Sequence, residues 1–238
     1  MSEEKTKKRE KQPVIEYNNK KYLRIPVKTH VILREDNIID VVKKYTEEVI
    51  KDNDIVFISE KAVAITQGRA FPLEEIKPRP LARFLSNHVT KTPVGIGLGI
   101  PETMEMALRE CGVLKILFAA AVSFITKLFG RKGDFYRIAG YRASSIDGPT
   151  PNTLPPYNRY VVLGPDEPDK VAHDISESIK AEVAIVDMND LGGNILGTSS
   201  KSMDRKMLLG VLRDNPLGQC SEQTPIGIIR LLQELQAN

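Results

Sequence analysis

The chain has 238 residues, 41% of them hydrophobic, which is enough apolar material for one large domain or two small intertwined ones. The formal net charge is +3, and the first twelve residues, with five basic and three acidic side chains, supply +2 of it and leave about +1 for the body. A near-neutral body excludes the clustered basic surface that nucleic-acid binding needs.

Cysteine and histidine are too few and too scattered for a structural zinc site: the sequence has Cys111, Cys220, His30, His88 and His173. The first residues form no apolar signal segment, so we expect a cytoplasmic protein. The most apolar stretch, residues 113–129, is at the short limit for crossing a bilayer and is typical of a buried helix. We therefore expect no membrane partner. We expect residues 1–13 to form a disordered charged tail.

Over residues 14–238, apolar periodicity predicts strands and helices without strict alternation or repeat. Short β-branched runs predict strands over 22–27, 55–59, 62–66, 135–140, 160–163, 183–187 and 226–230. Helical spacing of apolar side chains predicts helices over 36–51, 81–89, 102–129, 169–181 and 203–213, with Asp36 as a cap and Pro101 in a first turn. The predicted fold is α+β with mixed sheets, either as a single unit or as two intertwined subdomains.

Oxygen-bearing side chains follow several of these segments. Asp147 comes after a predicted strand, and Asp187 ends the apolar run VAIVD, with Asn189 and Asp190 directly beyond it. The late loop adds Gly218, Gln219 and Glu222. Carboxylates at the ends of apolar segments can converge on Mg²⁺ or Mn²⁺ and leave coordination positions for phosphate. The alternative is that each residue serves its own turn or strand end. No serine motif or cysteine–base pair supports nucleophilic catalysis, so no catalytic residue is assigned.

Five segments resemble, in order, motifs of the γ-glutamyl ligase family that adds glutamate to the deazaflavin coenzyme F-420. THVILREDNI (29–38) is similar to its nucleotide-contacting segment, and KDNDIVFISEKAVAITQGR (51–69) to its signature hairpin. SSIDGP, which contains Asp147, is similar to its Gly-Ile-Asp metal motif, and AIVDMND to its strand ending in Asp-Thr-Asn. NPLGQCSEQTPIGIIR is similar to its closing loop and final strand. The resemblance runs from about residue 25 to 230 and implies the fold of that family.

The resemblance implies a ligase that uses GTP and Mg²⁺ or Mn²⁺ to join L-glutamate to F-420-0 through an acyl phosphate, and it implies a homodimer. The positions implied along the nucleotide are His30, Val31, Ile32, Leu33, Lys61, Gly218 and Gln219. The positions implied for the metal are Asp147 and Asp187, with Asn189, Asp190 and Glu222 as further oxygen donors.

Five positions depart from the family pattern, and one of them is Ser145, which stands before Ile146 where a glycine is expected. Ile65 stands where a lysine is expected, and Gln67 and Gln219 stand where glutamates are expected. Met188 replaces a threonine and cannot offer an oxygen to a hard metal. Two alternatives therefore stay open: a ligase of the same fold that acts on another carboxylate substrate, and a non-catalytic protein that binds nucleotide or metal.

Overall fold

The computed structural model describes residues 11–89, 96–131, 133–151, 153–189, 192–218 and 222–234. The chain divides into two compact units whose segments alternate along the sequence. The sheet unit comprises Met1–Val31, Ile38–Ser59 and Glu167–Asn238, and the helical unit comprises Ile32–Asn37 and Glu60–Asp166. Residues 1–10 of the expected tail lie outside the described residues.

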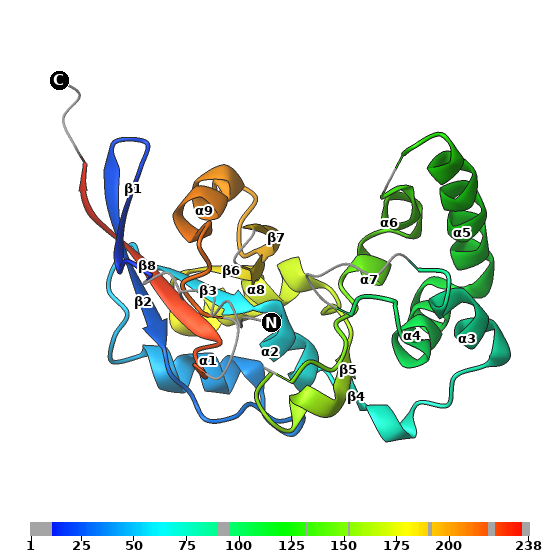
Figure 1. Cartoon of the computed structure of the whole chain (residues 1–238). Helices are drawn as coiled ribbons and strands as arrows, with labels where there is room; N and C mark the ends of the chain where they lie inside the picture. Colours follow the sequence, from blue (N-terminus) through cyan, green and yellow to red (C-terminus); the bar gives the residue numbers. More distant parts are fainter. Residues whose placement is uncertain are drawn as a thin grey trace, which may run out of the picture. The chain divides into compact units, whose positions relative to one another are not determined.

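The sheet unit is built on six strands in the order β1-β2-β8-β3-β6-β7 (Figure 1). Its elements are β1 (Val14–Tyr17), β2 (Lys20–Val27), α1 (Ile38–Thr46), β3 (Ile55–Ser59), α8 (Pro168–Ile179), β6 (Glu182–Asn189), β7 (Gly192–Thr198), α9 (Arg205–Leu212) and β8 (Ile226–Glu234). Strands β3 and β6 are parallel, and every other neighbouring pair is antiparallel. The sheet is therefore mixed, as predicted.

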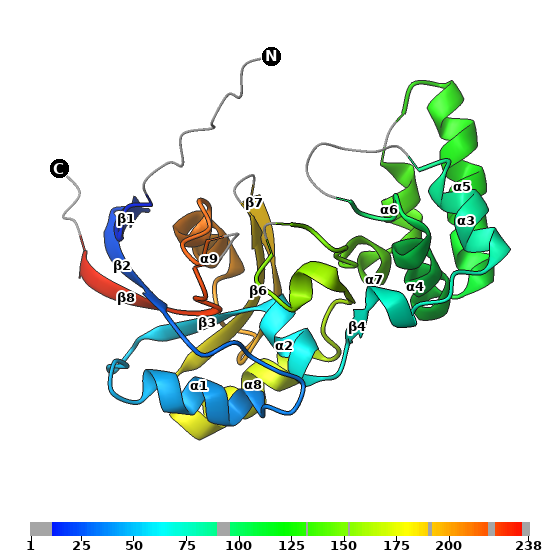
Figure 2. The same ribbon diagram turned by 60° about the horizontal axis from the view of Figure 1, so that its bottom comes forward.

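Helices cover both faces of this sheet, with α9 on one face and α1 and α8 on the other (Figures 1 and 2). The middle strands are consequently apolar on both faces, and Phe57 in β3 and Ala184 in β6 are fully buried. A Cβ atom on Gly227 of β8 would lie 2.3 Å from the Phe57 ring, so glycine is needed there for the ring to pack against the strand. Leu208 and Leu212 of α9 complete this core.

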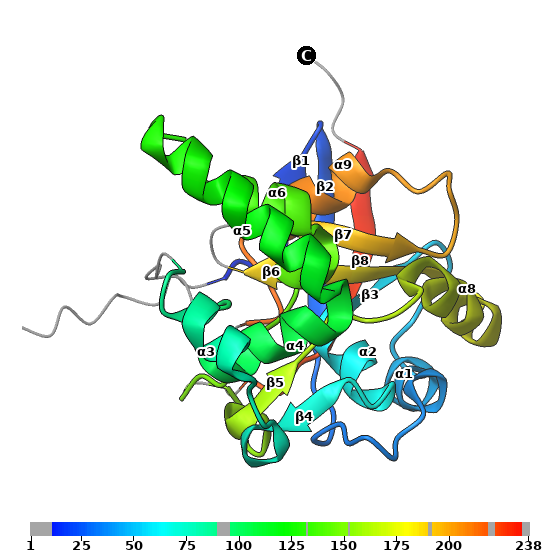
Figure 3. The same ribbon diagram turned by 90° about the vertical axis from the view of Figure 1, so that its right-hand side faces the viewer.

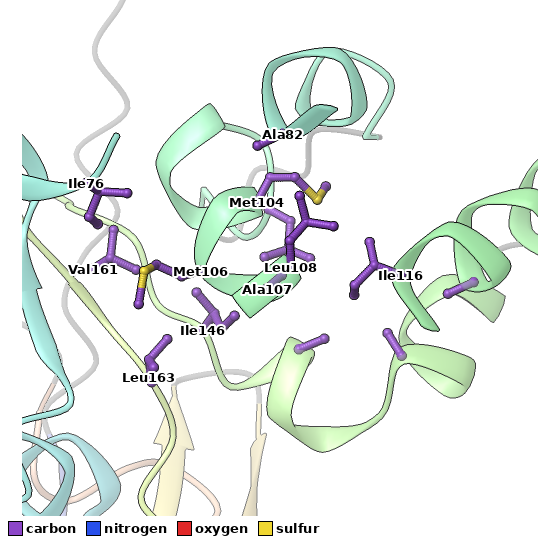
Figure 4. Packing of buried hydrophobic residues seen from close by; sticks show 14 residues of the cluster. Ile76, Ala82, Met104, Met106, Ala107, Leu108, Ile116, Ile146, Val161 and Leu163 are labelled. Carbon is purple, nitrogen blue, oxygen red and sulfur yellow. The ribbon is translucent and has the colours of Figure 1, made fainter. Parts of the chain in front are cut away.

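The helical unit contains short elements around its own core. They are α2 (Glu60–Thr66), β4 (Ala70–Pro72), η1 (Leu73–Glu75), α3 (Pro80–Ser86), α4 (Pro101–Cys111), α5 (Val113–Leu128), α6 (Asp134–Ala139), α7 (Tyr141–Ser144), η2 (Tyr157–Arg159) and β5 (Tyr160–Val162). Strands β4 and β5 form a separate antiparallel pair. Figure 3 shows α5 as the long helix of this unit, and Figure 4 shows Met104 and Leu108 of α4 and Ile116 of α5 in the core of the unit.

Gly112 separates α4 from α5, which the sequence predicted as one helix over 102–129. Its φ of 86° and ψ of 143° are readily adopted by glycine and strained for residues with a Cβ atom, and the helix direction bends by 116° at this residue. Among the described residues, no single helix is long and apolar enough to cross a membrane; α4 and α5 meet that requirement only when they are taken together across the bend.

Two predicted strands are wrong and are helices in the structure. Residues 62–66 belong to α2, in which Ala62 to Ile65 are all buried, so the run has no alternation that could distinguish a strand from a buried helix. The helix ends in a Schellman motif at Gly68, where the Arg69 N–H reaches the Ala64 carbonyl. Residues 135–139 belong to α6, and Gly140 is its C-cap; the helix packs on the core through Phe135, Tyr136, Ile138 and Ala139.

The other predicted elements are confirmed, the strand over 55–59 with the same bounds and the others with shifted ends. The first helix is shorter than its predicted span of 36–51, since α1 begins at Ile38 and ends at Thr46. Asp36 accepts the backbone N–H of Leu33 at 2.7 Å, in the turn that precedes α1. Local side-chain-to-backbone bonding of this kind is the reason that aspartate favours turns.

Candidate functional site

In the sheet unit, residues 29 and 30 are tied to the last loop and to α1. The Thr29 N–H donates to the Gln223 carbonyl at 3.1 Å, and the Gln223 amide returns a bond to the Thr29 carbonyl at 2.8 Å. The His30 N–H donates to the Tyr45 hydroxyl, which also lies 2.9 Å from His30 Nδ1. The residue just before the predicted nucleotide segment 30–33 is therefore bonded to Gln223, which follows Glu222 in the last loop and which the sequence analysis missed.

The last loop brings Glu222 against Gly218. A Cβ atom on Gly218 would lie 2.6 Å from the Glu222 carboxyl carbon, and the φ of Gly218 is +84°. Glycine is required here both by the backbone conformation and by the close approach of the carboxylate. The predicted contact residue Gln219 lies outside the described residues.

Asp187 lies within β6, and the strand continues for two residues beyond it. Asp187 pairs with Asn194 of β7, and Asn189 pairs with Gly192. Met188 packs against the core of the sheet unit. Because successive side chains of a strand point to opposite faces, Asp187 and Asn189 share the face away from Met188. Core packing thus explains why a methionine stands at position 188, where the family pattern has a threonine. Asp190 lies outside the described residues.

In the helical unit, Tyr157 anchors the rest of the 29–33 segment. Its hydroxyl donates to the Ile32 carbonyl at 2.8 Å, and Tyr157 and Ile32 are both buried. Burial, followed by the nearby Tyr160 and the acidic Glu35 and Asp36, raises the pKa of Tyr157 to about 12. The neutral hydroxyl is therefore stable as a donor at neutral pH. The sequence signal for this residue was weak: a tyrosine after two prolines in TLPPY.

Lys61 and Asp147 form an ion pair in the same unit. The Lys61 Nζ atom lies 2.5 Å from Asp147 Oδ2, and the two side chains are 31% and 45% exposed. Lys61 lies in the first turn of α2. The backbone of Asp147 exchanges two hydrogen bonds with Val162 of β5, at 2.8 and 2.9 Å, which fixes the position of the carboxylate. Two residues predicted separately, one for nucleotide and one for metal, are thus in direct contact.

The residues that follow Lys61 have structural roles. Ile65, at the position where the family resemblance expects lysine, is buried in α2. The Gln67 side chain exchanges two hydrogen bonds with the backbone of Asp166, at 2.8 and 2.9 Å. Arg69 pairs with Glu110 at 2.6 Å and with Asp166 at 2.9 Å, and it donates to the Gly164 carbonyl.

Arg34 was also missed by the sequence analysis. Its guanidinium lies against Gly68, where an added Cβ would be 3.0 Å from Arg34 Nε. A glycine at the end of α2 therefore both adopts the left-handed conformation and leaves space for this cation.

The predicted metal donors are divided between the units. Asp147 belongs to the helical unit, whereas Asp187, Asn189 and Glu222 belong to the sheet unit. In the described part of the chain, no group of three or more histidine, cysteine, aspartate or glutamate side chains is arranged to hold a metal ion. The donors present are carboxylate and amide oxygens, which suit Mg²⁺ or Mn²⁺ when phosphate oxygens supply further ligands.

A family model described as F-420-0:gamma-glutamyl ligase matches residues 26–191, which is more than half of the chain. The matched range includes the 29–33 segment, Lys61, Asp147 and Asp187 and ends just beyond β6. A search among curated proteins finds no match to the chain.

Proposed function

The chain belongs to the F-420-0:gamma-glutamyl ligase family, and from this premise we propose that it joins L-glutamate to F-420-0 with GTP and Mg²⁺ or Mn²⁺. The observation that carries the proposal is the Lys61–Asp147 pair, which places an ammonium beside a carboxylate in the matched region. Phosphoryl transfer between two anions needs this combination of cation and metal-binding oxygen.

The proposed reaction has two steps. An oxygen of the F-420-0 carboxylate attacks the γ-phosphorus of GTP, the bond to the β-phosphate oxygen breaks, and GDP leaves. The amine of L-glutamate then attacks the carbonyl carbon of the acyl phosphate, and inorganic phosphate leaves as the amine loses a proton. Each step moves negative charge between oxygens, so the task of the protein is to position the anions and offset their repulsion.

We assign the side chains to this task as follows. Lys61 binds phosphate oxygens, and the 29–33 segment, held by Tyr157 and Gln223, lines the nucleotide. Asp147 in the helical unit is a proposed metal donor, and Asp187, with Asn189 or Glu222, is proposed for the same role in the sheet unit. A bound Mg²⁺ or Mn²⁺ would supply positive charge against the triphosphate.

A second candidate is a ligase of the same fold that acts on a different carboxylate. The observation that favours it is the use of Ile65 and Gln67 for packing and loop support, at positions where the resemblance expects a lysine and a glutamate. Loss of charge at these two positions would change which anion the site accepts. Product formation with F-420-0 distinguishes the two candidates.

Thermal unfolding with GTP, ATP and Mn²⁺, singly and combined, tests the binding half of the proposal. A ligand that binds only the folded chain stabilises it by about 2.7 kcal/mol at a hundred times its Kd. We expect an increase in Tm with GTP that requires Mn²⁺ and is lost in Lys61→Met. The matched control is Lys180→Met, which removes an exposed lysine paired with Glu177. The Tm of this variant should still increase with GTP and Mn²⁺. No change in Tm with any combination would contradict nucleotide binding.

A further inference from the structure

One face of α5 carries large apolar side chains that the described residues leave exposed. The opposite face packs on the core of the helical unit through Ile116 and Ala119, which are fully buried. The outer residues, including the one that directly follows the helix, are exposed by between 38% and 83%: Leu114, Leu117, Phe118, Phe124, Ile125, Leu128 and Phe129. A helix that is apolar all round is normally buried on all sides, so this face requires a partner.

The exposed residues form a single stripe with a small residue at its centre. At 3.6 residues per turn, Leu114, Phe118, Ala121, Ile125 and Leu128 follow one another at steps of four and three along the same side of the helix. Ala121 is the middle position of this stripe. A small residue there lets another helix approach closely, while the larger side chains on either side surround the contact.

The sequence of α5 is nearly the same when it is read in reverse about Ala121. Leu114 corresponds to Leu128, Phe118 to Phe124, and Lys115 to Lys127. In a twofold-symmetric antiparallel pair, each residue lies opposite its counterpart at the same distance from the axis. The reversal therefore places leucine near leucine and phenylalanine near phenylalanine, with the two Ala121 residues at the crossing.

The area of the stripe is sufficient for a stable pair. From the exposed fractions, its seven large side chains present on the order of 900 Å² of accessible surface in each copy. Stable protein–protein interfaces bury about 800 Å² per partner. We therefore propose that α5 pairs with α5 of a second copy of this chain, antiparallel, with the twofold axis at Ala121.

The charges next to the stripe indicate the main alternative partner for this face of α5, an anionic bilayer. Residues 111–133 contain no acidic side chain and include Lys115, Lys127 and Arg131. Apolar and basic residues together are also typical of helices that lie on anionic bilayers. A bilayer, however, has no requirement for a small central residue or for a pattern that is preserved on reversal. These two features favour the second copy.

Disulfide cross-linking tests the register directly. Helices that cross at an axial distance of about 8–10 Å bring the Cα atoms at the crossing to within roughly 3–6 Å, which suits a disulfide. With Cys111 and Cys220 both replaced by serine, we expect Ala121→Cys to form a covalent dimer on oxidation. Leu114→Cys should not, because seven residues on either side of the axis separate the two copies by about 21 Å. Cross-linking of Leu114→Cys, or none with Ala121→Cys, would overturn the proposal.

The mass in solution provides a second test. We expect sedimentation of the full chain to give twice the monomer mass of 26.6 kDa, and Phe118→Glu to halve it with an unchanged circular dichroism spectrum. Phe84→Glu is the matched control, since Phe84 is an exposed phenylalanine on α3 of the same unit and should leave the dimer intact. A monomeric wild type, a dimeric Phe118→Glu, or a monomer that binds phosphatidylserine vesicles through Phe118 would each overturn the proposal.

Discussion

At the scale of single residues, Tyr157 is the clearest support of the candidate site. Its hydroxyl is the donor to the Ile32 carbonyl, and both residues are buried. Loss of the hydroxyl would leave a buried carbonyl without its hydrogen bond, which costs about 1–3 kcal/mol. We expect Tyr157→Phe to lower the free energy of unfolding by that amount, as measured by urea denaturation.

Tyr160 provides the control for this prediction. It packs edge to face against Tyr157, and the described residues supply no hydrogen bond for its hydroxyl. Tyr160→Phe should therefore change the free energy of unfolding by less than about 0.5 kcal/mol. Equal losses in the two variants would contradict the anchoring role of Tyr157.

The raised pKa of Tyr157 also predicts a pH dependence. The group has a pKa of 10.0 in its ordinary state and about 12 in the folded chain, so its contribution to stability is complete below pH 10 and is lost as the pH rises toward 12. We expect the stability difference between wild type and Tyr157→Phe to shrink over this interval. Parallel unfolding curves at pH 9 and pH 11.5 measure it, and a constant difference would exclude the assigned shift.

Gln67 shows how a departure from the family pattern can be structural. Its amide nitrogen donates to the Asp166 carbonyl, and its oxygen accepts the Asp166 N–H. A glutamate keeps the second bond and loses the first. We expect Gln67→Glu to lower the free energy of unfolding by about 1 kcal/mol. An increase in stability would mean that the amide donor is not needed.

The sequence indicated individual candidate residues but not the contacts between them. Asp147 and Lys61 stand out because each adjoins an apolar run, but nothing in the sequence indicates that a helix start and a strand-bridged turn bring them to 2.5 Å. Gln223 and Tyr157 were missed because their roles depend on hydrogen bonds to carbonyls distant in sequence. Such bonds leave no periodic pattern.

At the scale of elements, the bend between α4 and α5 depends on one glycine. Gly112 has a φ of 86° and a ψ of 143°, and an added Cβ would meet no atom within 4 Å. The cost of a substitution there is therefore backbone strain alone, about 1–3 kcal/mol. We expect Gly112→Ala to lower the free energy of unfolding by this amount, measured by thermal or urea denaturation.

Gly130 offers a comparison at the other end of α5. It also has a positive φ, of 77°, but it ends the helix in a Schellman motif, with Arg131 N–H bonded to the Thr126 carbonyl. Asparagine is tolerated in that conformation. Gly130→Asn should therefore cost less than Gly112→Ala, and the reverse order would contradict the assigned conformations.

The elements were predicted well where periodicity was strong and poorly where an apolar run was short. Helix α8 and strands β3, β6 and β8 follow from clear patterns. Residues 62–66 were predicted to form a strand, although five β-branched and small residues fit a strand and a helix equally well. In the structure they form α2, and Ala62 to Ile65 are all buried there. The break at Gly112 was missed because a single glycine in an apolar pattern is often tolerated within a helix.

At the scale of the whole molecule, the two units interleave along the chain, and the family match spans both of them. Asp187, Asn189 and the last loop belong to the sheet unit, and Lys61, Asp147 and the Tyr157 anchor belong to the helical unit. Proposed site residues therefore occur in each unit and can be tested separately. A substitution in either unit, such as Asp147→Asn or Asp187→Asn, should reduce turnover while the chain stays folded.

The most direct test of the ligase proposal is turnover followed by mass spectrometry. Purified protein would be incubated with F-420-0, L-glutamate, GTP and Mn²⁺, with each component omitted in turn and with Asp147→Asn as a folded control. We predict a product heavier than F-420-0 by one glutamyl residue, one phosphate released for each amide formed, and less product from the variant. GTP binding that requires Mn²⁺, with no glutamylated product at any substrate concentration, would contradict the assignment to F-420-0 and favour another carboxylate substrate.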